Sequence, residues 1–240
     1  MNQFRVAVLS QMPNPQTVIY AAMHQDYSEG WVWDEHDRWP DEAKCGEIVV
    51  KRLLMGERGH YGPLEHPQIV FNVGYFPHSV MQQARTHRVG TSFDVQSMRY
   101  TGQRIIKAAL GGIPIEEVFY LRPVGEYVDR FGKKYAYTEA QRQADLAWCQ
   151  TAAERYKNNL ETGMSEEHAR GILPFDYRQH FVVSFNVRSL MHFLDLRAKK
   201  DAQLEIQSLC DLLWPHFQAW VPEIADWYEK NRLGKARLSP

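Results

Sequence analysis

The spacing of apolar residues along the chain predicts a mixture of strands and helices. Short apolar or alternating runs predict strands over residues 4–9, 68–76 and 177–188. Apolar residues at helical spacing predict helices over 15–26, from 40 to the glycines at 56 and 59, and over 80–87, 139–160, 189–196 and 201–228, with a short helix from 165. The predicted class is α+β, with helices packed on a mostly antiparallel sheet in a single domain, residues 1–240.

Local signals mark the ends of several of these elements. Asn14-Pro15 is typical of a helix start, and Thr138-Glu-Ala-Gln141 resembles a capping box. Residues 30–40 are aromatic and acidic without either period, and they are interpreted as a loop or lid. On the helix predicted over 80–87, Gln83 and His87 are four residues apart and would therefore share a face.

Composition and charge limit the classes of partner that this protein is expected to bind. The 240 residues are 44% hydrophobic, which allows a substantial core. With 28 basic and 29 acidic side chains, no overall field favours a nucleic acid or an anionic membrane, and neither is expected as a partner. Cys45, Cys149 and Cys210 are widely spaced, which favours a reducing cytoplasm over a disulfide framework. No apolar run is long enough to cross a bilayer, so we expect a soluble protein.

Two arginine-rich segments hold the candidate chemistry, and their polar members are Arg85, Arg88, Ser97 and Arg99 in the first and Arg170, Arg188 and Arg197 in the second. Arginine stays charged at every accessible pH and presents a planar fork of donors, which suits a phosphate or the edge of a pyrimidine. Ser97 and Arg99 would point the same way in an extended segment. A single arginine is more often part of an ordinary surface ion pair, but this clustering favours an anion site.

The segment around Pro63 offers a second candidate, with His60, Glu65 and His66 close together. It lacks the His-Glu-x-x-His spacing of a zinc site, and no metal is expected. Imidazole and carboxylate groups can address the polar edge of a fused heterocycle, so a ring cofactor fits better. The alternative is that Glu65 and His66 satisfy the backbone of a turn. The cysteines are expected in the core, and no motif supports covalent catalysis or a Rossmann site.

His87-Arg88 followed by Ser97-x-Arg99-Tyr100 resembles the Arg-His-Arg-x7-Ser signature of the flavin-dependent thymidylate synthases. Further blocks of that family are matched in order by Gly59-His60 with Leu64-Glu65-His66, the helix that bears Gln83, Ala169-Arg170-Gly-Ile-Leu-Pro174, Asn186-Val-Arg188-Ser-Leu, and Leu196-Arg197-Ala with Ala202-Gln203-x-Glu205-Ile206. The motif-bearing core covers about residues 45–215.

This resemblance implies the reductive methylation of dUMP to dTMP, with 5,10-methylenetetrahydrofolate as carbon donor, FAD as hydride carrier, NADPH as reductant and no enzyme nucleophile. The matched positions imply dUMP contacts for Gln83, Ser97, Arg99, Arg170 and Arg197. Arg197, beside the uracil edge, is the catalytic candidate. FAD contacts are implied for His60, Glu65, His87, Arg88, Asn186 and His192. The family builds each site from several subunits of a homotetramer, which implies the same assembly here.

The chain departs from the family pattern in several places. Thr86 replaces the first arginine of the signature, and Arg85 is a candidate substitute for the missing charge. One additional residue lies between Arg88 and Ser97, which requires a local bulge if Ser97 is to reach the phosphate. The position that is normally glutamate falls to Asp94, Val95 or Gln96, and Asp201 stands where many members carry histidine.

Two other functions remain open from the sequence. The altered signature permits a nucleotide-binding flavoprotein oxidoreductase that lacks methyl transfer. A non-enzymatic nucleotide- or nucleic-acid-binding module is the third hypothesis, and the near-neutral charge argues against it.

Overall fold

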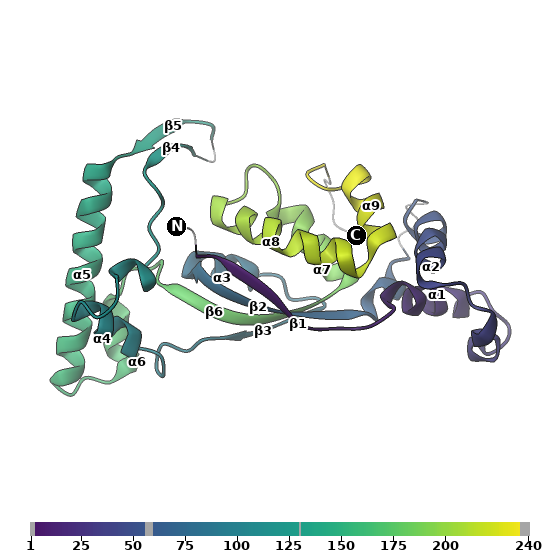
Figure 1. Cartoon of the computed structure of the whole chain (residues 1–240), viewed down its shortest axis with the longest axis horizontal. Coiled ribbons are helices and arrows are strands. Elements are labelled where there is room, and N and C mark those ends of the chain that lie inside the picture. The colour runs from purple at the N-terminus through teal and green to yellow at the C-terminus, as the bar shows by residue number, and fades with distance from the viewer. Residues whose placement is uncertain (1–2, 56–59, 130, 236–240) are drawn as a thin grey trace. The chain divides into compact units, whose positions relative to one another are not determined.

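The computed structural model describes residues 3–55, 60–129 and 131–235, and Figure 1 shows the order of its elements. The chain divides into two compact units, each built from separate segments. The first unit consists of Met1–Phe4, Val73–Gln83 and Asp94–Phe181. The second consists of Arg5–Asn72, Ala84–Phe93 and Val182–Pro240.

A four-stranded sheet has the order β1-β2-β6-β3. Its strands are β1 (Arg5–Gln11), β2 (Gln68–Pro77), β3 (Thr91–Val95) and β6 (Arg178–Asn186). Neighbouring strands are antiparallel, since backbone N–H groups at the end of one strand donate to carbonyls at the start of its neighbour: Met12 to Gln68 at 2.9 Å, His78 to Tyr177 at 3.0 Å and Gln96 to His180 at 3.0 Å. The predicted strands and the α+β class with an antiparallel sheet are confirmed.

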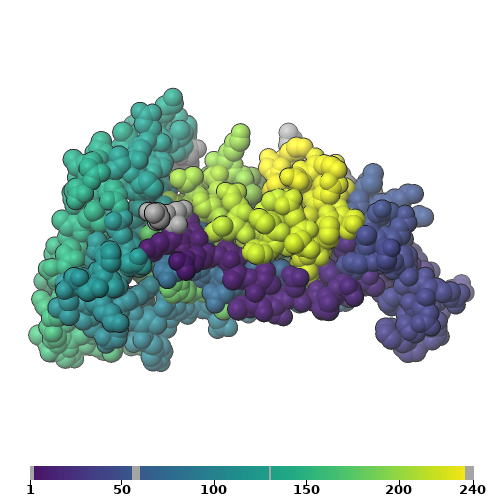
Figure 2. Space-filling model, viewed as in Figure 1, coloured from purple at the N-terminus to yellow at the C-terminus, as the bar shows by residue number. Residues whose placement is uncertain are grey.

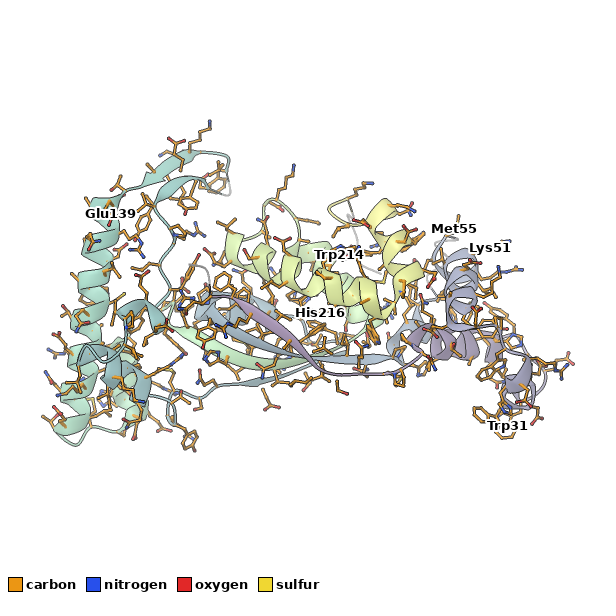
Figure 3. All side chains as sticks on the ribbon, viewed as in Figure 1. Trp31, Lys51, Met55, Glu139, Trp214 and His216 are labelled. Carbon is orange, nitrogen blue, oxygen red and sulfur yellow. The ribbon has the colours of Figure 1, made fainter. Side chains whose placement is uncertain are left out.

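The α-helices that lie wholly in the second unit are α1 (Pro15–Gln25), α2 (Glu42–Val49), α7 (Val187–Arg197), α8 (Leu204–Trp220) and α9 (Pro222–Asn231). Helix α1 packs against α2, and α2 packs against α9. Helix α8 packs against β1, α7 and α9, and Figure 3 labels Trp214 and His216 on it. The buried Phe185 ring of β6 lies 5.3 Å from the Phe193 ring of α7, so burial of aromatic surface fixes α7 on the sheet.

The first unit has its own helical core. Its elements include α3 (His78–Ala84, with Ala84 in the second unit), α4 (Gln103–Ala109), η4 (Ile115–Glu117), the antiparallel hairpin β4 (Gly125–Val128) and β5 (Lys134–Tyr137), α5 (Glu139–Glu161) and α6 (Glu166–Ala169). Buried residues shared by these segments form one cluster: Met98, Ile105, Ala108, Val118, Phe119, Cys149, Ala153, Tyr156 and Ala169. The predicted capping box at the start of α5 is confirmed, because Thr138 and Gln141 each accept the other's backbone N–H.

Residues 30–40 are not a loop. They contain a 3₁₀ helix, η1 (Val32–Arg38), in which Val32 is buried while Trp31 before it is 67% exposed (Figure 3). The Gln25 side chain accepts the Val32 N–H at 3.2 Å, and a His36 ring nitrogen lies 2.8 Å from the Trp33 carbonyl oxygen. These side-chain contacts stabilise a short helix that has no apolar period to reveal it.

Several predicted helices have different ends in the structure. The helix predicted from residue 40 begins at Glu42, where the Asp41 side chain accepts the Lys44 N–H, and becomes the π-helical turn η2 (Val50–Leu54). The glycines at 56 and 59 lie outside the described residues. The helix predicted from residue 165 ends at Ala169, and Arg170 begins the 3₁₀ turn η5 (Arg170–Ile172).

The single helix predicted over 201–228 is two helices, α8 and α9. Val221 between them has an extended φ of −134° and ψ of 69°, and Pro222 starts α9. A proline disfavours the helical conformation in the residue before it, which explains the break.

The helix predicted over 80–87 also ends early. Helix α3 stops at Ala84, and the His87 N–H closes a turn to the Ala84 carbonyl at 3.1 Å. The prediction that Gln83 and His87 share a helix face is therefore wrong. Among the described residues, none of the helices is both long and apolar enough to span a membrane.

Candidate active site

The residues with predicted FAD contacts all lie in the second unit: His60, Glu65, His87, Arg88, Asn186 and His192. His60 lies two residues before the 3₁₀ turn η3 (Gly62–Glu65), and Glu65 ends that turn. Asn186 is the N-cap of α7. Arg197 ends α7 in the same unit. Helix α7 with its N-cap and the turn after α3 therefore supply most of this set.

Arg197 is held by two adjacent residues of the turn after α3. Its Nε donates to Nε2 of His87 at 3.0 Å, and its Nη2 donates to the hydroxyl oxygen of Thr86 at 2.9 Å. Burial lowers the pKa of the guanidinium, but arginine stays protonated in proteins. The turn and the end of α7 are thus joined through one cation, which the sequence did not indicate.

Arg197, Thr86 and His87 form one group, and His87 is its most buried member, with 5% of its surface exposed. Its pKa is lowered to about 4, first by burial and then by the charges of Arg197 and His192. The imidazole is therefore neutral at pH 7. Because Nε2 accepts from Arg197, the proton must sit on Nδ1. This Nδ1 is buried and has no hydrogen-bond partner among the described residues.

His192 lies beside this group, and Asn186 precedes the helix that carries His192. The His192 ring is 5.1 Å from the His87 ring, and burial is the largest cause of its lowered pKa. Asn186 is 4% exposed, and its side-chain oxygen accepts the Ser189 N–H at 2.7 Å as the N-cap of α7. Asn186 thus has a structural role, in addition to any cofactor contact.

His60 and Glu65 have partners that sequence reasoning did not assign. Nε2 of His60 is 2.8 Å from a carboxylate oxygen of Asp26, and Glu65 accepts from Arg188 at 2.6 Å. The Arg188 guanidinium also lies 5.9 Å from the centre of the Tyr61 ring. These residues are far apart in sequence, so no local pattern could have paired them. Arg88 is exposed.

The other predicted dUMP residues lie in the first unit: Gln83, Ser97, Arg99 and Arg170. Ser97 and Arg99 follow β3 in a turn closed by Tyr100 N–H and Ser97 O at 3.1 Å, so the predicted extended segment is wrong. They nevertheless stay together, because the Arg99 N–H donates to the Ser97 hydroxyl oxygen at 3.4 Å.

Glu167 links Arg99 and Arg170, the two arginines of this unit with predicted dUMP contacts. It forms an ion pair with Arg99, and that hydrogen bond is the main cause of its lowered pKa, to which the charge of Arg170 contributes. Arg99, Glu167 and Arg170 are all exposed. Two of the residues with predicted dUMP contacts are thus brought together around an exposed carboxylate.

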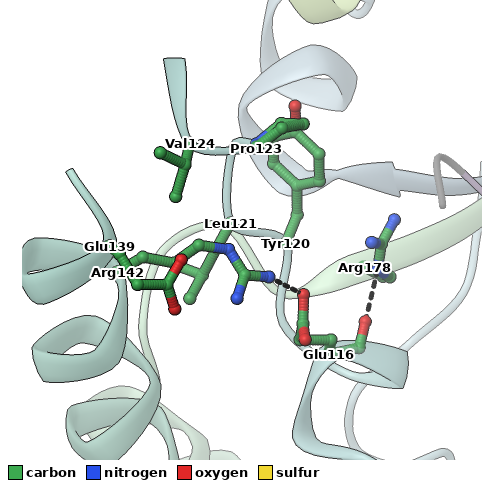
Figure 4. Close-up of a pocket in the computed structure, with 8 residues that line it drawn as sticks. All are labelled: Glu116, Tyr120, Leu121, Pro123, Val124, Glu139, Arg142 and Arg178. Carbon is green, nitrogen blue, oxygen red and sulfur yellow. Dashed lines mark hydrogen bonds and ion pairs between the residues drawn. The ribbon is translucent and has the colours of Figure 1, made fainter. Parts of the chain in front are cut away.

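Two cavities lie elsewhere and include none of the predicted site residues. One of about 360 Å³ in the first unit is lined partly by Arg142, which pairs with Glu116, and by the buried Arg178 (Figure 4). The other, about 680 Å³ in the second unit, runs between α2 with η2 and α9, which adjoin in Figure 2. Among the described residues there is no cluster of three or more His, Cys, Asp or Glu arranged to hold a metal ion.

Comparisons with known proteins agree with the sequence resemblance. Residues 7–223, which run through both units, match the Thy1 family, described as thymidylate synthase complementing protein. The flavin-dependent thymidylate synthase of Halobacterium salinarum is 34% identical over 252 residues, covering 98% of this chain and 100% of the relative. That of Haloarcula marismortui is 32% identical, covering 98% and 99%.

Solved structures share the fold. Thymidylate synthase X from Helicobacter pylori, with FAD and dUMP, superposes with a TM-score of 0.70 at 20% identity, covering 95% of this chain and 98% of the other. The UMP/dUMP methylase PolB from Streptomyces cacaoi, bound with 5-Br UMP, has a TM-score of 0.71 at 21% identity, covering 100% and 98%.

Fold and site together define an α+β protein with arginine and histidine clusters suited to an anionic heterocycle. The chain belongs to the flavin-dependent thymidylate synthase family.

Proposed function

We propose that this chain methylates dUMP to dTMP, with FAD as cofactor, 5,10-methylenetetrahydrofolate as carbon donor and NADPH as reductant. The observation that carries the proposal is the Arg197 guanidinium, fixed at the end of α7 by the neutral His87 and by Thr86, in a chain that matches this enzyme family over most of its length.

The residues present fit a flavin. The buried Nδ1–H of His87 lacks a protein acceptor among the described residues, and burying an unpaired donor is costly unless a ligand accepts from it. Carbonyl and nitrogen acceptors line the edge of an isoalloxazine ring. His87, with His60, Glu65, Arg88, Asn186 and His192, would hold FAD. When bound, FAD supplies a carrier for the hydride, which no amino-acid side chain provides.

For dUMP, we propose that Arg99, Arg170, Ser97 and Gln83 hold the nucleotide. The Arg99–Glu167 ion pair is exposed and therefore weak, so replacing the carboxylate by a phosphate costs little. Bidentate donation from arginine then favours the phosphate by charge and by shape.

We assign Arg197 the catalytic role. A guanidinium fixed beside the uracil edge stabilises negative charge on the ring as N3 loses its proton. Electron density then rises at C5, the carbon that receives the one-carbon unit. The protein supplies no nucleophile in this scheme. All three cysteines are buried, and burial raises their pKa values, which disfavours the reactive thiolate.

The functional form proposed is a homotetramer of a single-domain chain, residues 1–240, in which several subunits contribute to each site. Its support is the resemblance to the family, which builds each site from several subunits of a homotetramer. The three unpaired cysteines suit a reducing compartment, and we propose a cytoplasmic location.

Complementation of a thymidine-requiring strain tests the function. We expect the gene to restore growth without thymidine, and the purified protein to be yellow with a flavin spectrum that dUMP alters. A yellow protein that never complements would support the alternative, a nucleotide-binding flavoprotein oxidoreductase without methyl transfer. A colourless protein that takes up no FAD would contradict both.

A further inference from the structure

Thr86 contacts Arg197, and the sequence alone does not predict this contact. The residue is exposed in the turn after α3, and its hydroxyl oxygen accepts a hydrogen bond from Nη2 of Arg197 at 2.9 Å. The next residue, His87, accepts from Nε of the same guanidinium at 3.0 Å. Two consecutive residues therefore bind two different nitrogens of one planar cation.

Binding at two nitrogens restricts the cation more than binding at one. Rotation about the bond between Cδ and Nε carries Nη2 away from Thr86, and the bond between Nε and Cζ does not rotate freely because the guanidinium is planar and delocalised. Retaining both hydrogen bonds thus fixes the plane of the guanidinium and the direction of Nη1. Both of these acceptors are uncharged, so neither cancels the positive charge of Arg197.

The chemistry of the side chain at position 86 matters here. In the resembling signature this position is arginine, which has five donors and no acceptor, and so could not accept from Arg197. Threonine offers lone pairs and no charge. In this chain the departure at position 86 supplies a hydrogen-bond acceptor for Arg197 in place of a second cation.

We propose that Thr86 is a positioning residue that, together with His87, holds the Arg197 guanidinium in one orientation for the pyrimidine ring. Its catalytic consequence rests on the proposed function, whereas the hydrogen bond itself does not. Thr86 is exposed, so loss of its hydroxyl leaves no cavity in the core and does not threaten the fold.

Thr86→Val keeps the shape and removes the acceptor, and Thr86→Ser keeps the acceptor. We expect Thr86→Val to lower kcat for dTMP formation by about tenfold, with KM for dUMP, FAD content and Tm changed little, because orientation and not binding is lost. Thr86→Ser should retain most of the turnover. The matched control is Thr151→Val on α5, whose hydroxyl donates to Ala147 O of its own helix, and it should behave as wild type.

A second measurement does not depend on activity. Ligand-free crystal structures should show Arg197 in one orientation in wild type and Thr86→Ser, and in several rotamers in Thr86→Val. Wild-type turnover in Thr86→Val, equal losses in Thr86→Val and Thr86→Ser, or an unchanged Arg197 in Thr86→Val would overturn the proposal. If wild type makes no dTMP but Arg197 is released in Thr86→Val, the proposed function fails while the orienting contact stands.

Discussion

Arg197 combines a fixed orientation with a charge that its two uncharged acceptors leave in place. Replacement by alanine removes the charge that stabilises the developing anion and leaves the other predicted dUMP and FAD ligands intact. We expect Arg197→Ala to lower kcat by roughly 10²–10³-fold, with smaller losses of FAD and dUMP affinity. Single-turnover kinetics and equilibrium titrations separate these quantities. Equal loss of all three would show that Arg197 is only structural.

The buried neutral His87 makes stability depend on pH. In the unfolded chain a histidine takes up a proton near pH 6.5, whereas folded His87 stays neutral down to about pH 4. The unfolded state binds more protons between these values, so stability is present above pH 6.5 and is lost as the pH falls toward 4. The loss amounts to about 2 kcal/mol between pH 7.5 and pH 5.

His87→Gln is the matched variant for this test, because an amide oxygen can accept from Arg197 without titrating. Urea unfolding at pH 7.5 and pH 5 should show a smaller loss of free energy of unfolding in His87→Gln than in wild type. An identical pH dependence in the two proteins would contradict a lowered His87 pKa.

At the residue scale, sequence and structure supply different information. Residue chemistry and motif order indicated the cationic site, and the structure brings Arg197, His87 and His192 together. The contacts of Thr86 with Arg197, Asp26 with His60 and Glu65 with Arg188 could not be predicted. They join residues that are distant in sequence, and only the folded chain pairs them.

At the scale of elements, the turn at Gly90, just before β3, contacts Asn186, the residue that precedes α7. Gly90 has a φ of +67°, and its carbonyl oxygen accepts from the backbone N–H of Asn186 at 3.2 Å. A Cβ at this position would lie 2.4 Å from Nδ2 of the Asn186 side chain. An added methyl group would meet both backbone strain and a buried neighbour. The turn therefore fixes the N-cap of the helix that carries Arg197 and His192.

Gly111→Ala provides the control for this turn. Gly111 has a φ of +73°, but a Cβ there would meet nothing within 4 Å. We expect Gly111→Ala to cost about 1 kcal/mol from backbone strain alone, and Gly90→Ala to cost roughly 2–4 kcal/mol because Asn186 must also move. Chemical denaturation measures both. Equal costs would show that the contact with Asn186 contributes nothing.

Elements with strong local signals were predicted well. The capping box at Thr138 fixes the start of α5 through contacts within a few residues, and Pro15 favours the start of α1 through its restricted φ, while Asn14 makes no side-chain cap hydrogen bond. The 3₁₀ helix η1 was missed because it has no apolar period of its own, whereas the π-helical turn η2 lies inside the helix predicted from residue 40. The early end of α3 depends on the turn that places His87 beside Arg197, which is a tertiary effect.

At the scale of the whole molecule, the proposed tetramer predicts that inactive variants can complement each other. Arg170 lies in the first unit and Arg197 in the second. If different subunits supply them to one site, random mixing of Arg170→Ala and Arg197→Ala subunits restores about a quarter of the sites. Activity after mixed refolding measures this. No recovery would show that one chain supplies both residues or that the subunits do not assemble.

Formation of dTMP tests the account most directly. Purified protein is incubated with FAD, NADPH, dUMP and methylenetetrahydrofolate that is deuterated at the transferred carbon. The mass of the nucleotide product is then measured by mass spectrometry. We predict dTMP that carries the deuterated methyl group, and none when NADPH is left out or when the bound FAD has been removed beforehand. Steady oxidation of NADPH while dUMP stays unchanged would contradict the account.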